Sequence, residues 1–345
     1  MKFFGCPAEE NGFGKGFMAR EGCFSGLDAV FSWHPAARNM PFAWRMLANY
    51  KVRFDFTGRS AHAANCPEQG RSALDACELM NVGANYLREH ITTQARLHCA
   101  YLDCGGEAPN VVQAHASLLY VVRAPKLSDC TDILERLKKI AQGAALMTET
   151  SVSCTVLGGM SDMIPNPTLS ALLSDCLVKL GGPDFGEEDF AVARRYLDIL
   201  SPEQRARVIA EGAKLNGVSE EEFARHPLHT GTIPFMPGML KRVVPGSTDV
   251  GDVSYQVPTA QINTAAALIG TDAHTWQYTG QVGTGLGDRS AQAAARAIAL
   301  ACAAVYEDPS IAAKAKEELL EETGGQYNCP IPAELSYTDL IASQN

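Results

Sequence analysis

Between Tyr50 and Thr57, apolar and polar residues alternate strictly along the chain. The apolar positions are Tyr50, Val52, Phe54 and Phe56, and the polar ones are Lys51, Arg53, Asp55 and Thr57. A period of two residues is typical of a β-strand that has one buried face and one face in water. The pattern therefore predicts a half-buried strand at this point of the chain.

The hundred residues that follow show helical and strand patterns in a definite order. The expected elements are a helix over 71–89, strands over 95–104 and 115–123, a helix that begins at Ser128 or Asp129, and a strand over 151–157. Together with the first strand they give the order βαββαβ, which is that of a ferredoxin-like unit. We therefore predict an inserted ferredoxin-like domain over residues 49–159.

The segments on either side, residues 1–48 and 160–345, predict an α/β domain that the insertion interrupts. Short buried strands are expected at 2–5 and 29–33, with a helical segment around 15–21 between them. Asn166 and Pro167 are typical of a helix start with a side-chain cap. A strand near 259–263, a loop that holds His274 and a long alanine-rich helix from Ser290 complete the chain.

Composition and charge narrow the classes of function. The 345 residues include 29 basic and 39 acidic ones, for a net charge of -10, so nucleic acid and anionic membranes are poor candidate partners. The 11 cysteines are scattered singly, as expected for reduced thiols in a cytoplasmic protein. The apolar stretch from Ala291 to Tyr306 contains Arg296 and is too short to span a membrane.

Three places in the predicted α/β domain carry candidate chemistry. Glu9 and Glu10 follow an expected strand, His34 ends the next strand as Trp33-His34-Pro35, and His274 lies in a polar loop after an apolar strand. Open α/β sheets present ligand sites at the carboxyl ends of their strands. Adjacent carboxylates could there divide the work, one as a metal ligand and one as a general base. Taken singly, a Glu-Glu pair is more often a solvated surface feature, and a lone histidine is often a core or rim residue.

The inserted domain holds three further candidates. His62 lies in the loop after the alternating strand, Asn110 in the sequence PNVVQ and Arg123 in VVRAP. Separately, each is more typical of a solvated loop, a turn or a strand-end charge than of a ligand contact.

The motifs GCPAEE, SWHP, TGRSAHAAN, SALDA, GGEAPNVVQA, VRAP, GAALMTET, STDVGDVS and AHTWQ occur along the chain in that order. In this the chain resembles the metal-dependent amidohydrolases of the glutamate carboxypeptidase and aminoacylase family. The resemblance implies a zinc-peptidase-like α/β catalytic domain with an inserted ferredoxin-like βαββαβ lid and dimerisation domain. It also implies site residues: Glu9 as general base, Glu10, His34 and His274 as ligands of zinc or manganese, His62 as an oxyanion-stabilising group that crosses a dimer interface, and Asn110 and Arg123 at the substrate carboxylate.

What the resemblance implies for function is hydrolysis of an amide between an acyl or aroyl group and an amino acid, with para-aminobenzoyl-glutamate as the leading substrate. The expected assembly is a homodimer or a heterodimer with a related A-type subunit. The sequence departs from the family pattern in one respect. The family takes further metal ligands from an upstream segment that contains histidine and cysteine or aspartate, and this sequence has no such motif. We therefore expect the catalytic domain to be incomplete at its N-terminus. His98-Cys99 resembles that segment only superficially, because it lies on a predicted strand. The alternative is a catalytically silent relative that acts as a structural or regulatory subunit.

Overall fold

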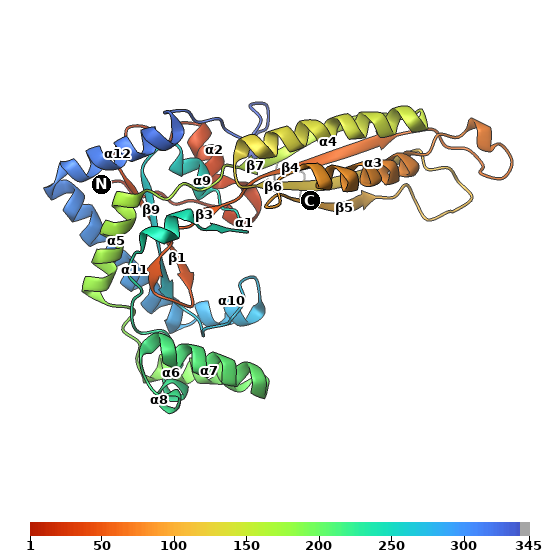
Figure 1. Ribbon diagram of the computed structural model, residues 1–345. Coiled ribbons are helices and arrows are strands. Elements are labelled where there is room, and N and C mark those ends of the chain that lie inside the picture. Colours follow the sequence, from red (N-terminus) through yellow and green to blue (C-terminus); the bar gives the residue numbers. More distant parts are fainter. Residues whose placement is uncertain (339–345) are drawn as a thin grey trace.

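The computed structural model describes residues 1–338, which form a body and a long arm that projects from it (Figure 1). We call residues 48–160 the arm. Its elements are β4 (Ala48–Thr57), α3 (Ala73–Leu87), β5 (Arg96–Asp103), β6 (His115–Ala124), α4 (Leu127–Thr148) and β7 (Ser151–Met160), with short 3-10 turns η1 (Pro67–Gln69) and η2 (Arg88–His90). This is the order of strands and helices that the hydrophobic pattern predicts.

The arm is one sheet with two helices on one face. The strands lie in the order β5-β6-β4-β7, and each neighbouring pair is antiparallel. The core between the sheet and the helices includes Val52, Phe54, Phe56, Leu118, Tyr120 and Leu137. The alternating polar residues of β4 therefore lie on the other face of the sheet, as expected from the period of two.

Helix α4 begins earlier than predicted. It starts at Leu127 after Lys126, and neither Ser128 nor Asp129 caps it. Instead, Oδ1 of Asp162, in the connection that leads back to the body, accepts a hydrogen bond from the amide of Leu127 at 3.0 Å. A carboxylate from a distant segment thus accepts the hydrogen bond of a free amide in the first turn of the helix. This partner is close only in the folded structure.

The body is built on a three-stranded sheet with the order β1-β9-β2. β1 (Val30–Ala36) runs parallel to β9 (Thr259–Ala265), and β2 (Met40–Pro41) is antiparallel to β9. Helices α5 (Pro167–Leu180) and α11 (Gly285–Glu307) pack on the sheet through a common core that includes Leu169, Leu173, Ile262 and Ala297. As predicted, Asn166 caps α5 by accepting a hydrogen bond from the amide of Leu169 at 3.0 Å.

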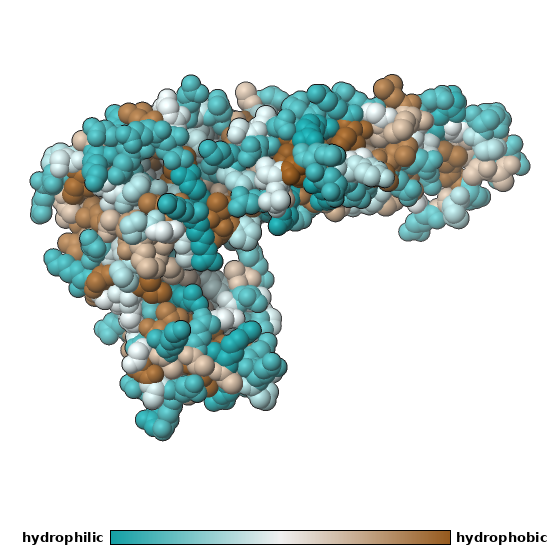
Figure 2. Space-filling view, viewed as in Figure 1, coloured by the Kyte–Doolittle hydropathy of each residue, from teal (hydrophilic) through white to brown (hydrophobic). Residues whose placement is uncertain are grey.

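Smaller elements surround this sheet. They are α1 (Glu9–Gly12), α2 (Gly14–Arg20), the paired strands β3 (Arg45–Met46) and β8 (Val243–Val244), α6 (Glu187–Asp198), α7 (Pro202–Asn216), α8 (Glu220–Arg225), η3 (Pro237–Lys241), α9 (Val250–Ser254), α10 (Trp276–Val282) and α12 (Pro309–Thr323). The surface is mostly hydrophilic, with separate apolar patches on body and arm (Figure 2). Among the described residues, every helix is too short or too polar to cross a membrane.

The strand predicted at residues 2–5 is wrong. This segment has no regular structure, and only Phe4 of these residues is half-buried. Its ring packs against Phe24 at a centroid distance of 5.2 Å. A strand forms only where a neighbour supplies its hydrogen bonds, and within residues 1–338 no strand lies beside this segment.

Candidate active site

The two adjacent glutamates begin a short helix instead of ending a strand. Helix α1 consists of Glu9–Gly12, and Ala8 before it has a φ of 60°. Such a left-handed residue is uncommon outside glycine and turns the chain sharply. Glu9 is half-buried, whereas Glu10 is exposed, so the two carboxylates lie in different surroundings.

The structure brings Glu10 and His274 together although they are far apart in the sequence. The Nε2 atom of His274 lies 3.7 Å from Oε2 of Glu10, and both side chains are largely exposed. His274 itself has a φ of 59°, in the left-handed region that few residues adopt. A carboxylate oxygen and an imidazole nitrogen at this separation are the types of donor that zinc and manganese bind.

His34 lies near the carboxyl end of β1 and is exposed. Its Nδ1 is 2.5 Å from the carbonyl oxygen of Pro35. Because a carbonyl oxygen only accepts, Nδ1 carries a proton, and in the neutral ring Nε2 then has a lone pair that could bind a metal. β1 and β9 are parallel, so His34 and the loop that carries His274 leave the sheet at the same edge.

The donor types of Glu10, His34 and His274 therefore fit a divalent metal. Of these three side chains, the structure brings only Glu10 and His274 into contact. Within residues 1–338, no three side chains of histidine, cysteine, aspartate or glutamate form a group that could hold a metal ion. A complete zinc site takes at least three protein ligands.

His62 and Asn110 lie together at the outer end of the arm. The amide of Ala63 donates to the carbonyl oxygen of Asn110 at 2.9 Å, and His62 forms an isolated antiparallel bridge with Val111. His62 Nδ1 accepts hydrogen bonds from the amides of Ala64 and Asn65, each at 3.2 Å. In the neutral ring Nε2 therefore carries the proton, so His62 presents a donor where His34 presents an acceptor.

Neither His62 nor Asn110 reaches the glutamates of its own chain. β4 has 10 residues and separates this outer end from the body by about 33 Å, at about 3.3 Å per residue. Phe13, next to α1, packs instead at the inner end of the arm, where a Cβ on Gly158 would come within 2.6 Å of its ring.

Arg123 lies at that inner end, on β6. Its Nη1 donates a hydrogen bond to Oγ of Ser247 at 2.8 Å. Burial lowers the pKa of this half-buried guanidinium. Ser247 is two residues from Asp249, whose buried carboxylate forms an ion pair with Lys15 at 2.6 Å. Arg123 is thus linked to the segment that carries Glu9 and Glu10, whereas Asn110 is not.

Sequence reasoning missed a group of buried acids in the motif STDVGDVS. Asp252 is fully buried, and Oδ1 accepts hydrogen bonds from Ser161 Oγ at 2.7 Å and from the Tyr327 hydroxyl at 3.1 Å. Burial raises the pKa of Asp252 to about 7, although these hydrogen bonds oppose the change. Burial likewise raises the pKa of Asp249, which Lys15 partly offsets and Glu9 reinforces. The motif is visible in the sequence as part of the family resemblance, but the burial of its two aspartates is visible only in the fold.

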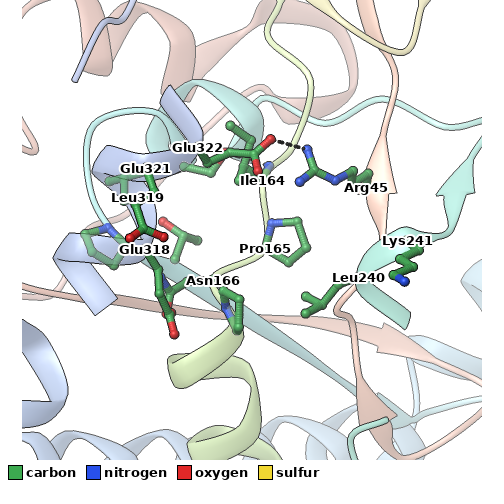
Figure 3. Close-up of a pocket in the computed structure, with 14 residues that line it drawn as sticks. Arg45, Ile164, Pro165, Asn166, Leu240, Lys241, Glu318, Leu319, Glu321 and Glu322 are labelled. Atoms are coloured by element: carbon green, nitrogen blue, oxygen red, sulfur yellow. Dashed lines mark hydrogen bonds and ion pairs between the residues drawn. The ribbon is translucent and has the colours of Figure 1, made fainter. Parts of the chain in front are cut away.

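A cavity of about 630 Å³ lies elsewhere on the body (Figure 3). Its wall includes the start of β9 at Thr259 and the ion pair between Arg45 and Glu322, whose atoms are 2.9 Å apart. It therefore lies at the amino end of β9, whereas His274 follows the carboxyl end. Since ligands of open α/β sheets bind at the carboxyl ends of strands, this cavity is not the candidate active site.

Comparisons with known proteins place the chain in a family. The peptidase dimerisation domain family matches residues 43–148, which include β4 to α4. The B-type subunit of p-aminobenzoyl-glutamate hydrolase from Escherichia coli K12 is 40% identical over 345 residues, which are 99% of this chain and 71% of that protein. The Xaa-Arg dipeptidase of Mus musculus is 28% identical over 96% of this chain and 63% of its own length.

A solved structure shares the fold. An aminohydrolase from methicillin-resistant Staphylococcus aureus superposes with a TM-score of 0.52 at 14% sequence identity, over 86% of this chain and 64% of that chain. The chain thus spans less than two thirds of this structure and of the mouse dipeptidase. On the identity and coverage shared with the E. coli protein, the chain belongs to the amidohydrolase family that includes the B-type subunit of p-aminobenzoyl-glutamate hydrolase.

Proposed function

We propose that the protein hydrolyses the amide bond between an acyl or aroyl group and an amino acid, with para-aminobenzoyl-glutamate as the leading substrate. The observation that carries this proposal is the 40% identity to the B-type p-aminobenzoyl-glutamate hydrolase protein over 99% of the chain. The contact between Glu10 and His274 at 3.7 Å supports it, because it joins two residues that the family resemblance selects from opposite ends of the sequence.

In this proposal Glu10 and His274, which lie 3.7 Å apart, would hold zinc or manganese together with His34, which leaves the sheet at the same edge. When bound, such an ion supplies Lewis-acid polarisation of the amide carbonyl and makes water more acidic. Glu9 accepts a proton from the attacking water as its oxygen bonds to the carbonyl carbon. The C–N bond then breaks, and Glu9 returns the proton to the leaving amine nitrogen.

The arm serves as a ferredoxin-like lid and dimerisation domain in this proposal. His62 and Asn110 are too far from Glu9 of their own chain, so they act in the site of a partner, either a second copy or a related A-type subunit. The proton on Nε2 of His62 suits it to donate to the oxyanion, a role that is typically worth about 100-fold to 1000-fold in rate. Arg123 holds a substrate carboxylate in its own chain's site.

Release of para-aminobenzoate from para-aminobenzoyl-glutamate tests the proposal. The purified protein is assayed with added zinc or manganese beside two variants, Glu9→Gln and Glu203→Gln. Glu203 is an exposed residue of α7 and serves as the control. We expect turnover by the wild type and the control and none by Glu9→Gln. A dimer that binds metal but hydrolyses neither this substrate nor other N-acyl amino acids would favour a catalytically silent role.

A further inference from the structure

We propose that Lys51, Arg96 and His98 form, beside Arg123, a second carboxylate-binding position that selects amino acids with an acidic side chain. The inference rests on the proposed function and deepens it, because it names the class of amino acid that the site accepts. It concerns the face of the arm's sheet that α3 and α4 leave open.

Strand register places these four side chains together. Arg96 of β5 is paired directly with Arg123 of β6, and His98 of β5 and Lys51 of β4 are both paired with Val121 of β6. Directly opposite residues have Cβ atoms about 4.5–5.5 Å apart, and diagonal neighbours lie within about 7–8 Å. Their neighbours Leu97, Val122 and Val52 face the buried core, so alternation puts all four on the open face.

Within the described part of the chain, the three cations of this cluster have no carboxylate partner. Arg96 donates to the carbonyl oxygens of Thr93 and Ala95, each at 2.7 Å, and Arg123 donates to a serine hydroxyl. Like charges directly opposite each other in a sheet are destabilising. Lys51 and Arg123 are half-buried, and Arg96 is exposed. One row further out on the same face, Arg53 does have a partner, since its Nε lies 2.8 Å from Asp55.

The electrostatic effect of the cluster is visible at His98. Burial lowers the pKa of its imidazole, and the charges of Arg123, Arg88 and Arg96 lower it further. These residues therefore produce a positive potential on a protein whose net charge is -10. An anion bound here would relieve the repulsion between the cations.

The cluster lies beside segments that lead to the candidate reaction groups. Arg123 contacts Ser247, and Lys15 pairs with Asp249 two residues further along. Gly158, paired with Lys51 in β7, lies against Phe13, which directly follows the helix that carries Glu9 and Glu10. Figure 1 shows α1 near the base of the arm.

The ligand that matches this arrangement is a dicarboxylic amino acid. Arg123 takes one carboxylate, and Lys51 and Arg96, with His98 as a further hydrogen-bond partner, take the other. A neutral side chain would leave the two additional cations without a partner, and a lysine or arginine side chain would be repelled. The cluster thus favours glutamate over the basic amino acid that the name of the mouse dipeptidase specifies.

The first experiment compares kcat/KM for para-aminobenzoyl-glutamate, para-aminobenzoyl-glutamine and para-aminobenzoyl-lysine. Hydrogen bonds to charged groups contribute about 1.5–3 kcal/mol, so we expect the wild type to prefer the glutamate amide by about 10-fold or more. The ratio of glutamate to glutamine kcat/KM should fall about 10-fold in Arg96→Gln and in Lys51→Gln. It should not change in Arg53→Gln, which removes a cation from the same face outside the cluster. An unchanged ratio in both cluster variants would overturn the inference.

The second experiment measures calorimetric binding of free glutamate and free glutamine, which needs no turnover. Glutamate should bind more tightly to the wild type and to Arg53→Gln, and this preference should be lost in Arg96→Gln. If none of the amides is cleaved but this pattern of binding holds, the proposed function fails and the cluster stands. If the glutamate amide is cleaved and neither experiment shows a preference for the acidic side chain, the proposed function stands and the inference is refuted.

Discussion

Replacement of Asp252 by asparagine should make the protein more stable at neutral pH. Asp252 is fully buried and lies between Ser161, which directly follows the arm, and Tyr327. Both side-chain donors point at Oδ1, and an asparagine keeps an oxygen acceptor of the same shape. The substitution therefore retains these two hydrogen bonds and removes the possibility of a negative charge. It also removes the acceptor of a long contact of 3.4 Å from the Ser161 amide to Oδ2.

The magnitude follows from the pKa of about 7, compared with 3.8 for an unperturbed carboxyl group. A carboxyl whose pKa is raised by folding favours the native state while it is protonated. As the pH rises from about 4 to about 7, the unfolded chain ionises first, and the free energy of unfolding falls by up to about 4 kcal/mol. Asparagine does not titrate, so this loss should be absent from the variant.

Urea denaturation followed by circular dichroism, at a series of pH values from 4 to 8, measures the effect. The difference in unfolding free energy between Asp252→Asn and the wild type should grow across this range and become constant above about pH 7. Asp184→Asn, which changes an exposed aspartate, should follow the wild type. A difference that stays constant with pH, or that shrinks as the pH rises, would refute the assignment of a buried neutral carboxyl to Asp252.

Three further outcomes are expected. If Glu9 moves a proton and Glu10 binds metal, Glu9→Gln should lose turnover and keep bound metal, whereas Glu10→Gln should lose metal. Elemental analysis measures the bound metal. Equal metal loss in both variants would contradict these roles. If His62 acts in a partner's site, mixing inactive His62→Ala with inactive Glu9→Gln should restore activity in mixed dimers. No recovery after verified subunit exchange would contradict this role and leave His62 a residue that shapes its own loop. Asn166→Ala should lower the free energy of unfolding by about 1–2 kcal/mol, because it removes the cap of α5 and a buried hydrogen bond to Ala315. An unchanged midpoint of urea denaturation would show that water replaces the cap.

Much of the secondary structure could be predicted from local patterns. The alternation from Tyr50 to Thr57 is satisfied by β4, because a period of two matches the pleat of a strand whichever partner it finds. The start of α5 at Pro167 was equally predictable, since its cap, Asn166, is adjacent in the sequence. The type and order of the arm's elements depend on such short-range patterns, whereas Glu9, Glu10, His34 and His274 were selected as a set by the family resemblance.

Features that depend on residues distant in the sequence were decided by the tertiary structure. Residues 2–5 have an apolar strand pattern, but no strand of residues 1–338 lies beside them. Helix α4 begins at Leu127 because Asp162 of a remote segment reaches its first turn. The contact of Glu10 with His274 and the positions of His62 and Asn110 at the outer end of the arm also came only from the fold. Lys51, Arg96 and Arg123 likewise look like ordinary strand charges in the sequence. They form a cluster because β6 lies between β4 and β5 in one particular register, and a shift of one residue would turn a strand's charges to the opposite face.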